Sequence, residues 1–351
     1  MADLNEDLHI LGEVIKPGEH KEILMPMPKL YIGSPLFSHV HVINGKKPGP
    51  ILGLIAALHG DELNGIEIIR KILKIRKIKE INGCLIAIPV ANVHGFVYQQ
   101  RYLMDRRDLN RSFPGTENGS LAARIAQLFY KEIIVKCTHI IDFHTGSLHR
   151  SNLPQIRGNI DNKDIRKLAM IFNPPVILNA KTRDGTLRAV ANDLKIKLLV
   201  YEAGEALRLE QTAIKFGVRG TINIMTHLGM INKDFISSYT TNIPSLICES
   251  SAWIRARHSG LFTGIKKLGN SVKANEVLGS IANPMSYHEK YIRTPISGII
   301  FGINNSPLVH EGSALFNIAS PEKMTRKQMA LLELLDNEEV ESLVERGGHG
   351  E

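Results

Sequence analysis

Cysteine is scarce in this sequence. The chain has only Cys84, Cys137 and Cys248, which are far apart and lie in apolar surroundings. A small, odd number of cysteines argues against a disulfide framework of the kind that holds small secreted domains together. None of the three forms a Cys-x-x-Cys pair, so a metal site would have to be built from histidines and carboxylates. We expect all three to be buried free thiols.

Long hydrophobic runs are also missing. The longest apolar stretches, such as residues 51–58, are far shorter than the roughly 20 residues that a transmembrane helix needs. The first ten residues, MADLNEDLHI, carry acidic side chains where a signal peptide needs positive charge, and no apolar segment follows them. We therefore expect a cytoplasmic protein without a membrane partner.

Aromatic residues make up only 6% of the chain, and this bears on the meaning of its positive charge. The formal net charge of +8 is by itself compatible with nucleic-acid binding. Much of the excess lies in RKILKIRKIKE, residues 70–80, where apolar residues recur at helical spacing between the basic ones. No aromatic pattern suited to base stacking accompanies these charges. We expect a solvated helix face and no nucleic-acid partner.

What the sequence does contain is a regular alternation of strand-like and helix-like segments. After short strands and turns over 8–45, the unbroken apolar run ILGLIAAL at 51–58 is typical of a strand buried on both faces. The segments that follow are predicted helices at 64–79, 121–135, 164–172 and 210–228, and predicted strands at 84–92, 138–143 and 197–203. This alternation predicts an α/β domain over residues 1–240, with a mostly parallel, twisted mixed sheet flanked by helices.

The sequence changes character near residue 241. Short strand-like segments broken by Gly, Asn and Pro predict a β-rich domain over residues 241–320. Its segments GLFTGIKKLGNSVKANEVLGSI (260–281) and YIRTPISGIIFGINNSPLVHEGSALFNI (291–318) are similar to a biotinyl/lipoyl-like barrel-sandwich. Lys290 is the nearby candidate for a carrier lysine, but its context is wrong, so we do not expect a carrier function. Residues 321–351 predict a helical tail.

Three predicted strands end in side chains that suit a metal site. The strand at 51–58 is followed by HGDE at 59–62, the strand at 138–143 by His144, and the third runs into YEAGE at 201–205. In open α/β sheets, sites form outside the carboxyl ends of strands, so we expect these side chains at one edge of the sheet. Gly60 allows the backbone to bend there without a Cβ clash. Two imidazoles and one carboxylate leave a fourth zinc position for water, which is the open geometry of catalytic sites.

A further polar segment, RYLMDRRDLNRSFPG at 101–115, lies between the first two of these segments. It places Asn110 beside Arg111, and a guanidinium group with an adjacent amide can bind a carboxylate through several hydrogen bonds. Arg101, Arg106 and Arg107 add further donors, one of which can stabilise the oxyanion of a tetrahedral intermediate.

Taken together, these segments resemble the succinylglutamate desuccinylase/aspartoacylase family, relatives of the zinc carboxypeptidases. The matching segments are HGDELNG (59–65), RYLMDRRDLNRSFPG (101–115), IDFHTGS (141–147) and YEAGE (201–205), in the family's order. The resemblance implies a zinc carboxypeptidase-like fold with one zinc ion per chain, held by His59, Glu62 and His144.

The resemblance also implies roles for other residues. Asn110 and Arg111 would hold the substrate carboxylate, and Arg101 would polarise the scissile carbonyl, although its spacing from Asn110 is longer than in aspartoacylases. Glu202 would be the general base, with Glu205 as its rival. The implied reaction is amide hydrolysis by metal-activated water, without a covalent acyl-enzyme. The β-rich domain would cap the cleft.

Three functions stay open at this point. The first is an amidohydrolase, or deacylase, that acts on a small N-acyl amino acid. The second is a carboxypeptidase-like enzyme with a peptide substrate, and the third is a non-catalytic scaffold on the same fold. Retention of every implied site residue counts against the scaffold.

Substrate choice is expected to depend on the predicted loops at 147–160 and 179–188. Four arginines are candidates for binding a second carboxylate: Arg150, Arg157, Arg183 and Arg188. The sequence does not decide the identity of the acyl group or of the amine. It also leaves open a divalent metal other than zinc. The oligomeric state is open as well, and a homo-oligomer is one alternative.

Overall fold

The structure is a computed structural model that describes residues 5–30, 32–232 and 244–321. The predicted boundary near residue 241 and the predicted helical tail, apart from Pro321, lie outside the described residues. No described helix is both long enough and apolar enough to cross a membrane.

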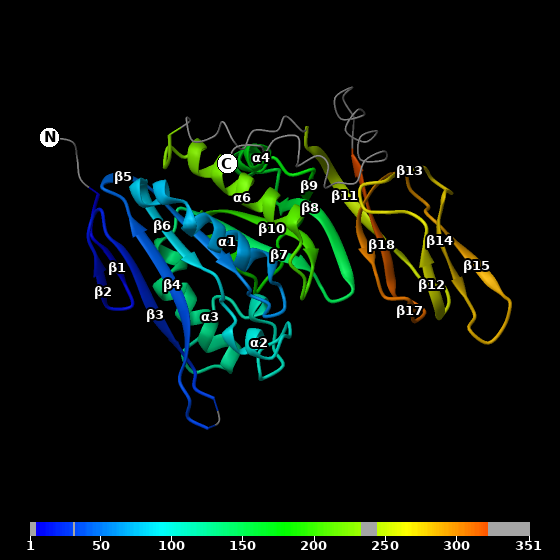
Figure 1. Ribbon diagram of the computed structural model, residues 1–351, viewed down its shortest axis with the longest axis horizontal. Coiled ribbons are helices and arrows are strands. Elements are labelled where there is room, and N and C mark those ends of the chain that lie inside the picture. Colours follow the sequence, from blue (N-terminus) through cyan, green and yellow to red (C-terminus); the bar gives the residue numbers. More distant parts are fainter. Residues whose placement is uncertain (1–4, 31, 233–243, 322–351) are drawn as a thin grey trace.

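The described chain folds into a layered α/β structure that continues into a region of strands alone (Figure 1). Its strands are β1 Leu8–Ile10, β2 Glu13–Ile15, β3 His20–Met27, β4 Leu36–Asn44, β5 Lys47–Ala56, β6 Asn82–Ile88, β7 His139–Gly146, β8 Arg150–Gly158, β9 Val176–Asn179, β10 Lys197–Glu205, β11 Leu246–Arg255, β12 Gly260–Gly264, β13 Ser271–Val272, β14 Val277–Ala282, β15 Glu289–Arg293, β16 Gly298–Asn304, β17 Leu308–Val309 and β18 Ala314–Pro321. Its α-helices are α1 Asn64–Lys74, α2 Val93–Val97, α3 Leu121–Glu132, α4 Lys163–Phe172, α5 Leu187–Asp193 and α6 Gln211–His227, with 3-10 helices at Arg76–Glu80, Leu109–Arg111 and Ile134–Lys136.

One large sheet dominates the described structure, with the order β13-β16-β18-β11-β9-β8-β10-β7-β5-β6-β4-β3. The neighbours β6, β5, β7 and β10 run parallel, as do β8, β9 and β11. Strand β10 meets β8 in antiparallel fashion, and β3, β4 and β6 also pair antiparallel. The predicted α/β fold with a mixed sheet flanked by helices is therefore confirmed.

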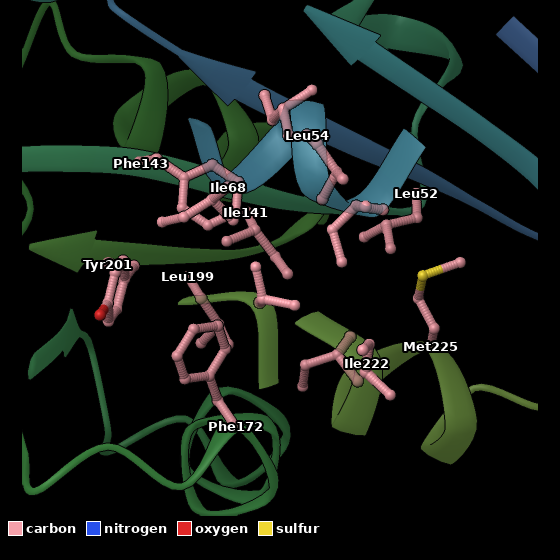
Figure 2. Close-up of a cluster of buried hydrophobic side chains, with 14 of the residues drawn as sticks. Leu52, Leu54, Ile68, Ile141, Phe143, Phe172, Leu199, Tyr201, Ile222 and Met225 are labelled. Atoms are coloured by element: carbon pink, nitrogen blue, oxygen red, sulfur yellow. The ribbon is translucent and has the colours of Figure 1, made fainter. Parts of the chain in front are cut away.

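Two apolar layers hold helices against the central strands. On one face, α1, α4 and α6 pack on the sheet. Figure 2 shows Phe172 of α4 beside Leu199 of β10, with Ile222 and Met225 of α6 in the same cluster. On the other face, α3, α5 and the β1–β2 hairpin cover the sheet. The helical spacing of apolar residues in the sequence produced these buried stripes, because each helix turns one apolar side toward the sheet.

Two predicted helix ends were wrong. The helix predicted at 64–79 ends at Lys74, because Ile75 takes an extended conformation before a 3-10 helix begins at Arg76. The helix predicted at 121–135 ends at Glu132 and is followed by a second short 3-10 helix. The basic stretch at 70–80 therefore spans a helix and a turn rather than one helix face.

The predicted loop at 147–160 was also wrong. Residues 150–158 form β8, which lies between β10 and β9 and contributes to the centre of the sheet. Within the predicted loop at 179–188, α5 begins at Leu187, and the side-chain oxygen of Thr186 caps its first turn. The first segment is therefore mostly a strand of the sheet, whereas the second stays irregular up to Thr186.

The region after residue 244 consists of strands, but it is not separate from the large sheet. Strand β11 pairs parallel with β9, and β16 pairs antiparallel with β8. Only β12, β14, β15 and β17 form a sheet of their own, which lies beyond β18 in Figure 1. The hydrophobic cluster of Leu153, Val176 and Leu246 further joins the two regions.

The three cysteines are buried free thiols, as predicted. Burial raises the pKa of Cys84, of Cys137 and of Cys248 to about 12 in each case. Cys84 and Cys137 belong to the hydrophobic layer under α3, whereas Cys248 lies on β11 in the cluster that joins the C-terminal strands.

Candidate active site

The site begins where β5 leaves the sheet. After Ala56 the chain turns before α1, and a backbone hydrogen bond from Glu62 N to His59 O (3.1 Å) closes this turn. Gly60 is required there because a Cβ atom would lie 1.9 Å from the carbonyl carbon of Gly95. The reason for the glycine is therefore the close approach of two backbones, rather than the bend that the sequence suggested.

His59, Glu62 and His144 come together as predicted, and one ligand atom from each lies within 4.8 Å of the others. Glu62 Oε1 lies 2.8 Å from His59 Nδ1, and Glu62 Oε2 lies 2.7 Å from His144 Nδ1. All three side chains are buried. The two Nδ1 atoms and the carboxylate thus face one point at the carboxyl ends of β5 and β7.

Each histidine also contacts a second carboxylate through its other ring nitrogen. His59 Nε2 lies 3.1 Å from Asp108 Oδ1, and His144 Nε2 lies 2.9 Å from Asp142 Oδ2. An Nε2–H donated to a carboxylate leaves Nδ1 as an acceptor lone pair, which is the form of imidazole that binds a metal.

The charges of the cluster also suit a cation. Burial opposes the charged form of Glu62, but the imidazoles of His59 and His144 outweigh it and hold the pKa of this carboxyl well below its ordinary value. Burial likewise opposes protonation of His144, yet Asp142 and Glu62 raise its pKa well above the ordinary value. Two imidazole nitrogens and a carboxylate form a donor set that accepts zinc and other first-row divalent ions.

The residues predicted from the 101–115 segment lie around this cluster. Arg101 Nη1 lies 3.6 Å from Glu62 Oε1, and its Nη2 donates to Asp108 Oδ2 at 2.8 Å. The Asn110 Oδ1 accepts a hydrogen bond from Leu187 N at 2.9 Å, which ties this segment to the start of α5. Arg111 is exposed and lines the same cavity as Arg101 and Asn110.

Glu202 and Glu205 occupy different surroundings. Glu202 pairs in register with His144 across β10 and β7, so the two side chains lie on one face of the sheet. Its carboxylate accepts hydrogen bonds from Asn152 Nδ2 (3.2 Å) and Arg157 Nη1 (3.2 Å). Glu202 lines the cavity that contains the cluster.

Glu205, by contrast, is used for structure. Its carboxylate accepts hydrogen bonds from His149 N at 3.0 Å and from Asn305 Nδ2 at 2.7 Å. It is not among the residues that line the cavity in the described part of the chain. The described contacts therefore favour Glu202 as the carboxylate available to a ligand.

The cavity beside the cluster has a volume of about 570 Å³ and is strongly basic. Besides Arg101 and Arg111, the cations on its wall are Arg157, Lys181, Arg183 and Arg188. Three of the four arginines predicted to bind a second carboxylate are therefore at the cavity. The fourth, Arg150, lies over the Trp253 ring at 5.7 Å and outside the cavity wall.

The strands after residue 244 supply one side of this cavity through Ser250, Ser251 and Trp253 of β11. The sequence indicated a capping role for this region but not these residues.

Sequence reasoning also missed Asp108, Asp142 and Asn152. It named Arg157 as a candidate for a second substrate carboxylate, whereas Arg157 donates to Glu202. A signal existed for Asp142, because it precedes His144 by two residues on a strand and so shares its face.

These features define a class of protein: an α/β fold with a buried His–Glu–His cluster at the carboxyl ends of its central strands and a basic cavity beside that cluster. Residues 48–228 match the model of the succinylglutamate desuccinylase/aspartoacylase catalytic domain. The chain belongs to the succinylglutamate desuccinylase/aspartoacylase family, as the sequence motifs indicated.

Known relatives agree with this assignment. The N-alpha-acetyl-L-2,4-diaminobutyric acid deacetylase of Halomonas elongata is 24% identical over 241 residues, which cover 66% of this chain and 70% of that protein. A crystal structure of succinylglutamate desuccinylase/aspartoacylase from Rhodobacter sphaeroides matches with a TM-score of 0.78 at 20% identity, over 87% of this chain and 96% of that one. The product-bound ectoine utilization protein EutE (DoeB) from Ruegeria pomeroyi matches with a TM-score of 0.76 at 19% identity, over 86% and 94%. At these identities the structures establish a shared fold.

Proposed function

We propose that this protein is a zinc-dependent amidohydrolase that removes the acyl group from a small N-acyl amino acid. The observation that carries the proposal is the convergence of His59, Glu62 and His144 on one point beside a basic cavity. Membership of the family and the similarity to a deacetylase of an acetylated amino acid support the same reaction class.

His59, Glu62 and His144 would hold one zinc ion, with Asp108 and Asp142 fixing the two imidazole rings from behind. When bound, zinc supplies a Lewis acid that polarises a carbonyl and lowers the pKa of a coordinated water to about 7. The protein contributes the shape and the charge of the surrounding cavity.

Glu202 is the proposed general base. It lies on the same sheet face as His144, and the Asn152 and Arg157 contacts hold its carboxylate in place. It would accept a proton from the attacking water and deliver it to the nitrogen of the leaving amine.

Arg101 is the proposed oxyanion donor, since its guanidinium group reaches the cluster while Asp108 holds it. Asn110 and Arg111 are proposed to bind the free carboxylate of the substrate at the cavity wall. The β11 residues would close the cavity and limit it to small substrates.

The test combines metal content with release of free amine from a panel of N-acyl amino acids and short peptides. We expect about one zinc per chain in the native protein and loss of this zinc in His59→Ala, because a catalytic zinc needs all three protein ligands. Glu202→Gln should keep the zinc and lose roughly 10²–10⁴-fold in kcat, the usual contribution of a general base. Glu205→Gln is the matched control, and with its fold intact it should stay active.

Three results would change the proposal. Loss of turnover in Glu205→Gln but not in Glu202→Gln would transfer the base to Glu205. Turnover of peptides in preference to N-acyl amino acids would favour the carboxypeptidase-like alternative. A native protein that takes up no divalent metal would favour the scaffold.

A further inference from the structure

A second group of potential metal ligands lies on the outer hairpin of the large sheet, remote from the cavity wall. Strands β3 and β4 pair antiparallel over their whole length, and β3 is the last strand of the sheet. Figure 1 shows this hairpin at the opposite side of the molecule from the C-terminal strands. None of its residues lines the cavity beside His59.

The register of the hairpin places four polar side chains on one face. His20 and Glu22 are two residues apart on β3, as His39 and His41 are on β4, and side chains two apart share a face. Glu22 is directly opposite His41, which brings all four to the same side. The opposite side of the hairpin carries Val40 and Val42 into the core.

Contacts within this group centre on Glu22. The Glu22 Oε1 atom contacts His39 Nδ1 directly. The rings of His20 and His41 have centroids 6.5 Å apart. Directly opposite residues on paired strands have Cβ atoms about 4.5–5.5 Å apart, so Glu22 and His41 lie within reach of a common ion.

Exposure gives the group freedom to close on an ion. Of the described residues, only His59, Glu62 and His144 already converge closely enough to hold one. On the hairpin, the side chains of His39 and Glu22 are 55% and 49% exposed, so they can rotate without disturbing the core. His41 is half-buried and provides the fixed point.

The positive charge of Lys79 determines which end of the group suits a cation. Lys79 places a positive charge close enough to His20 to act on its ring. Lys79 repels a cation from the His20 end, which favours Glu22, His39 and His41 as the ligands.

We propose that Glu22, His39 and His41 bind a second divalent cation of the late first-row transition metals, for which Zn²⁺ serves as the probe. Two imidazoles and one carboxylate select ions such as Zn²⁺, Ni²⁺ and Cu²⁺ over Mg²⁺ and Ca²⁺, which prefer oxygen ligands. An ion bound there would link the last strand of the sheet to its neighbour. This proposal does not rest on the proposed hydrolase function.

The experiment is a calorimetric titration of the untagged full-length protein with Zn²⁺, after its first metal site has been filled and excess ion removed. We expect one further equivalent to bind to the native protein. The double variant His39→Gln/His41→Gln should lose this equivalent or bind it at least tenfold more weakly. The matched control His288→Gln/His310→Gln removes two exposed histidines elsewhere and should keep it.

A Cu²⁺ titration followed by electron paramagnetic resonance adds an independent readout, since two coordinated imidazoles split the signal and the double variant should lose that splitting. The His59→Ala variant should still bind Zn²⁺ at the hairpin site. Failure of the proposed catalytic metal site can therefore be told apart from failure of the hairpin site. Absence of a second equivalent in native protein would overturn the proposal. Binding of a second equivalent by the double variant would also overturn the proposal. The Glu22–His39 contact would then be only a cross-strand ion pair.

Discussion

Asp142 lies behind His144 in the cluster, and its Oδ2 atom lies 2.9 Å from His144 Nε2. Asp142→Asn keeps the size of the side chain but removes the negative charge that fixes this ring. Loss of such an outer carboxylate typically weakens metal binding about 10–100-fold. We expect a decrease of this size in zinc affinity, measured by competition with a chelator, with an unchanged circular dichroism spectrum. An unchanged affinity would mean that the ring is held by packing alone.

His139, at the start of β7, should make the protein sensitive to acid. Burial, together with Lys197 and His227, lowers the pKa of His139 from 6.5 to about 4. Between these two pH values the unfolded chain binds a proton that the folded chain does not, so stability falls as the pH decreases through this window.

The comparison is urea unfolding at pH 7.5 and pH 5 for native protein and His139→Gln, both without metal. The variant should lose less stability than the native protein between the two pH values. Equal losses would show that His139 takes up its proton without strain in the folded state.

The His–Glu–His cluster could be predicted from the sequence because its residues lie close to the carboxyl ends of two strands, β5 and β7. His59 and Glu62 come from one short segment, and the strand-end rule brings His144 to the same edge. Asp108 could not be assigned to His59 in this way, because the two are 49 residues apart and meet only through the path of an irregular segment. The Arg157–Glu202 contact depends on β8, which the sequence did not reveal.

At the scale of elements, helices were easier to predict than the central strand β8. This strand reads RSNLPQIRG and has little apolar character, since Asn152 and Arg157 turn toward Glu202. A strand that uses its polar side chains for a site has the composition of a loop. The end of α1 was missed for another reason: apolar spacing continues past Ile75, although the backbone there is extended.

Helix α6 packs so closely against α4 that one glycine has no room for a side chain. A Cβ atom on Gly220 would lie 2.2 Å from the Phe172 ring, which is fully buried and cannot move away. Alanine favours a helix over glycine by about 1 kcal/mol, but overpacking a core costs about 1–3 kcal/mol. We therefore expect Gly220→Ala to destabilise the protein by about 1 kcal/mol.

Denaturant unfolding would measure this change. Asn223→Ala, in the same helix and only partly buried, is the control and should be neutral or stabilising. A more stable Gly220→Ala protein would show that the two helices can separate slightly without loss.

At the scale of the whole molecule, the continuity of the large sheet predicts that the chain up to residue 232 does not fold well without the C-terminal strands. A chain truncated after residue 232 would lose β11 beside β9 and β16 beside β8. It would also expose Leu153, Val176 and Leu178, now buried in a common cluster. Burial of each such side chain contributes about 1.5–3 kcal/mol, so the sum approaches the 5–15 kcal/mol that stabilises a typical protein.

We expect the truncated chain to aggregate or to melt at a much lower temperature than the full chain, as measured by light scattering and thermal unfolding. A monodisperse truncated protein that takes up the proposed zinc ion would show instead that the C-terminal strands only complete the cavity. The sequence predicted a β-rich region here but not its continuity with the main sheet, because strand pairing between distant segments leaves no local pattern.

The rates at which a reagent labels the buried thiols would report how often the surrounding structure opens. Cys84 and Cys137 lie in the layer under α3 and Cys248 lies on β11, and a pKa near 12 keeps each of them unreactive while it stays buried. A thiol reagent would therefore label each position only when the surrounding structure opens. Equal labelling rates at all three would show that the chain opens as a single unit. Faster labelling of Cys248 would show that the C-terminal strands open locally, independently of the rest.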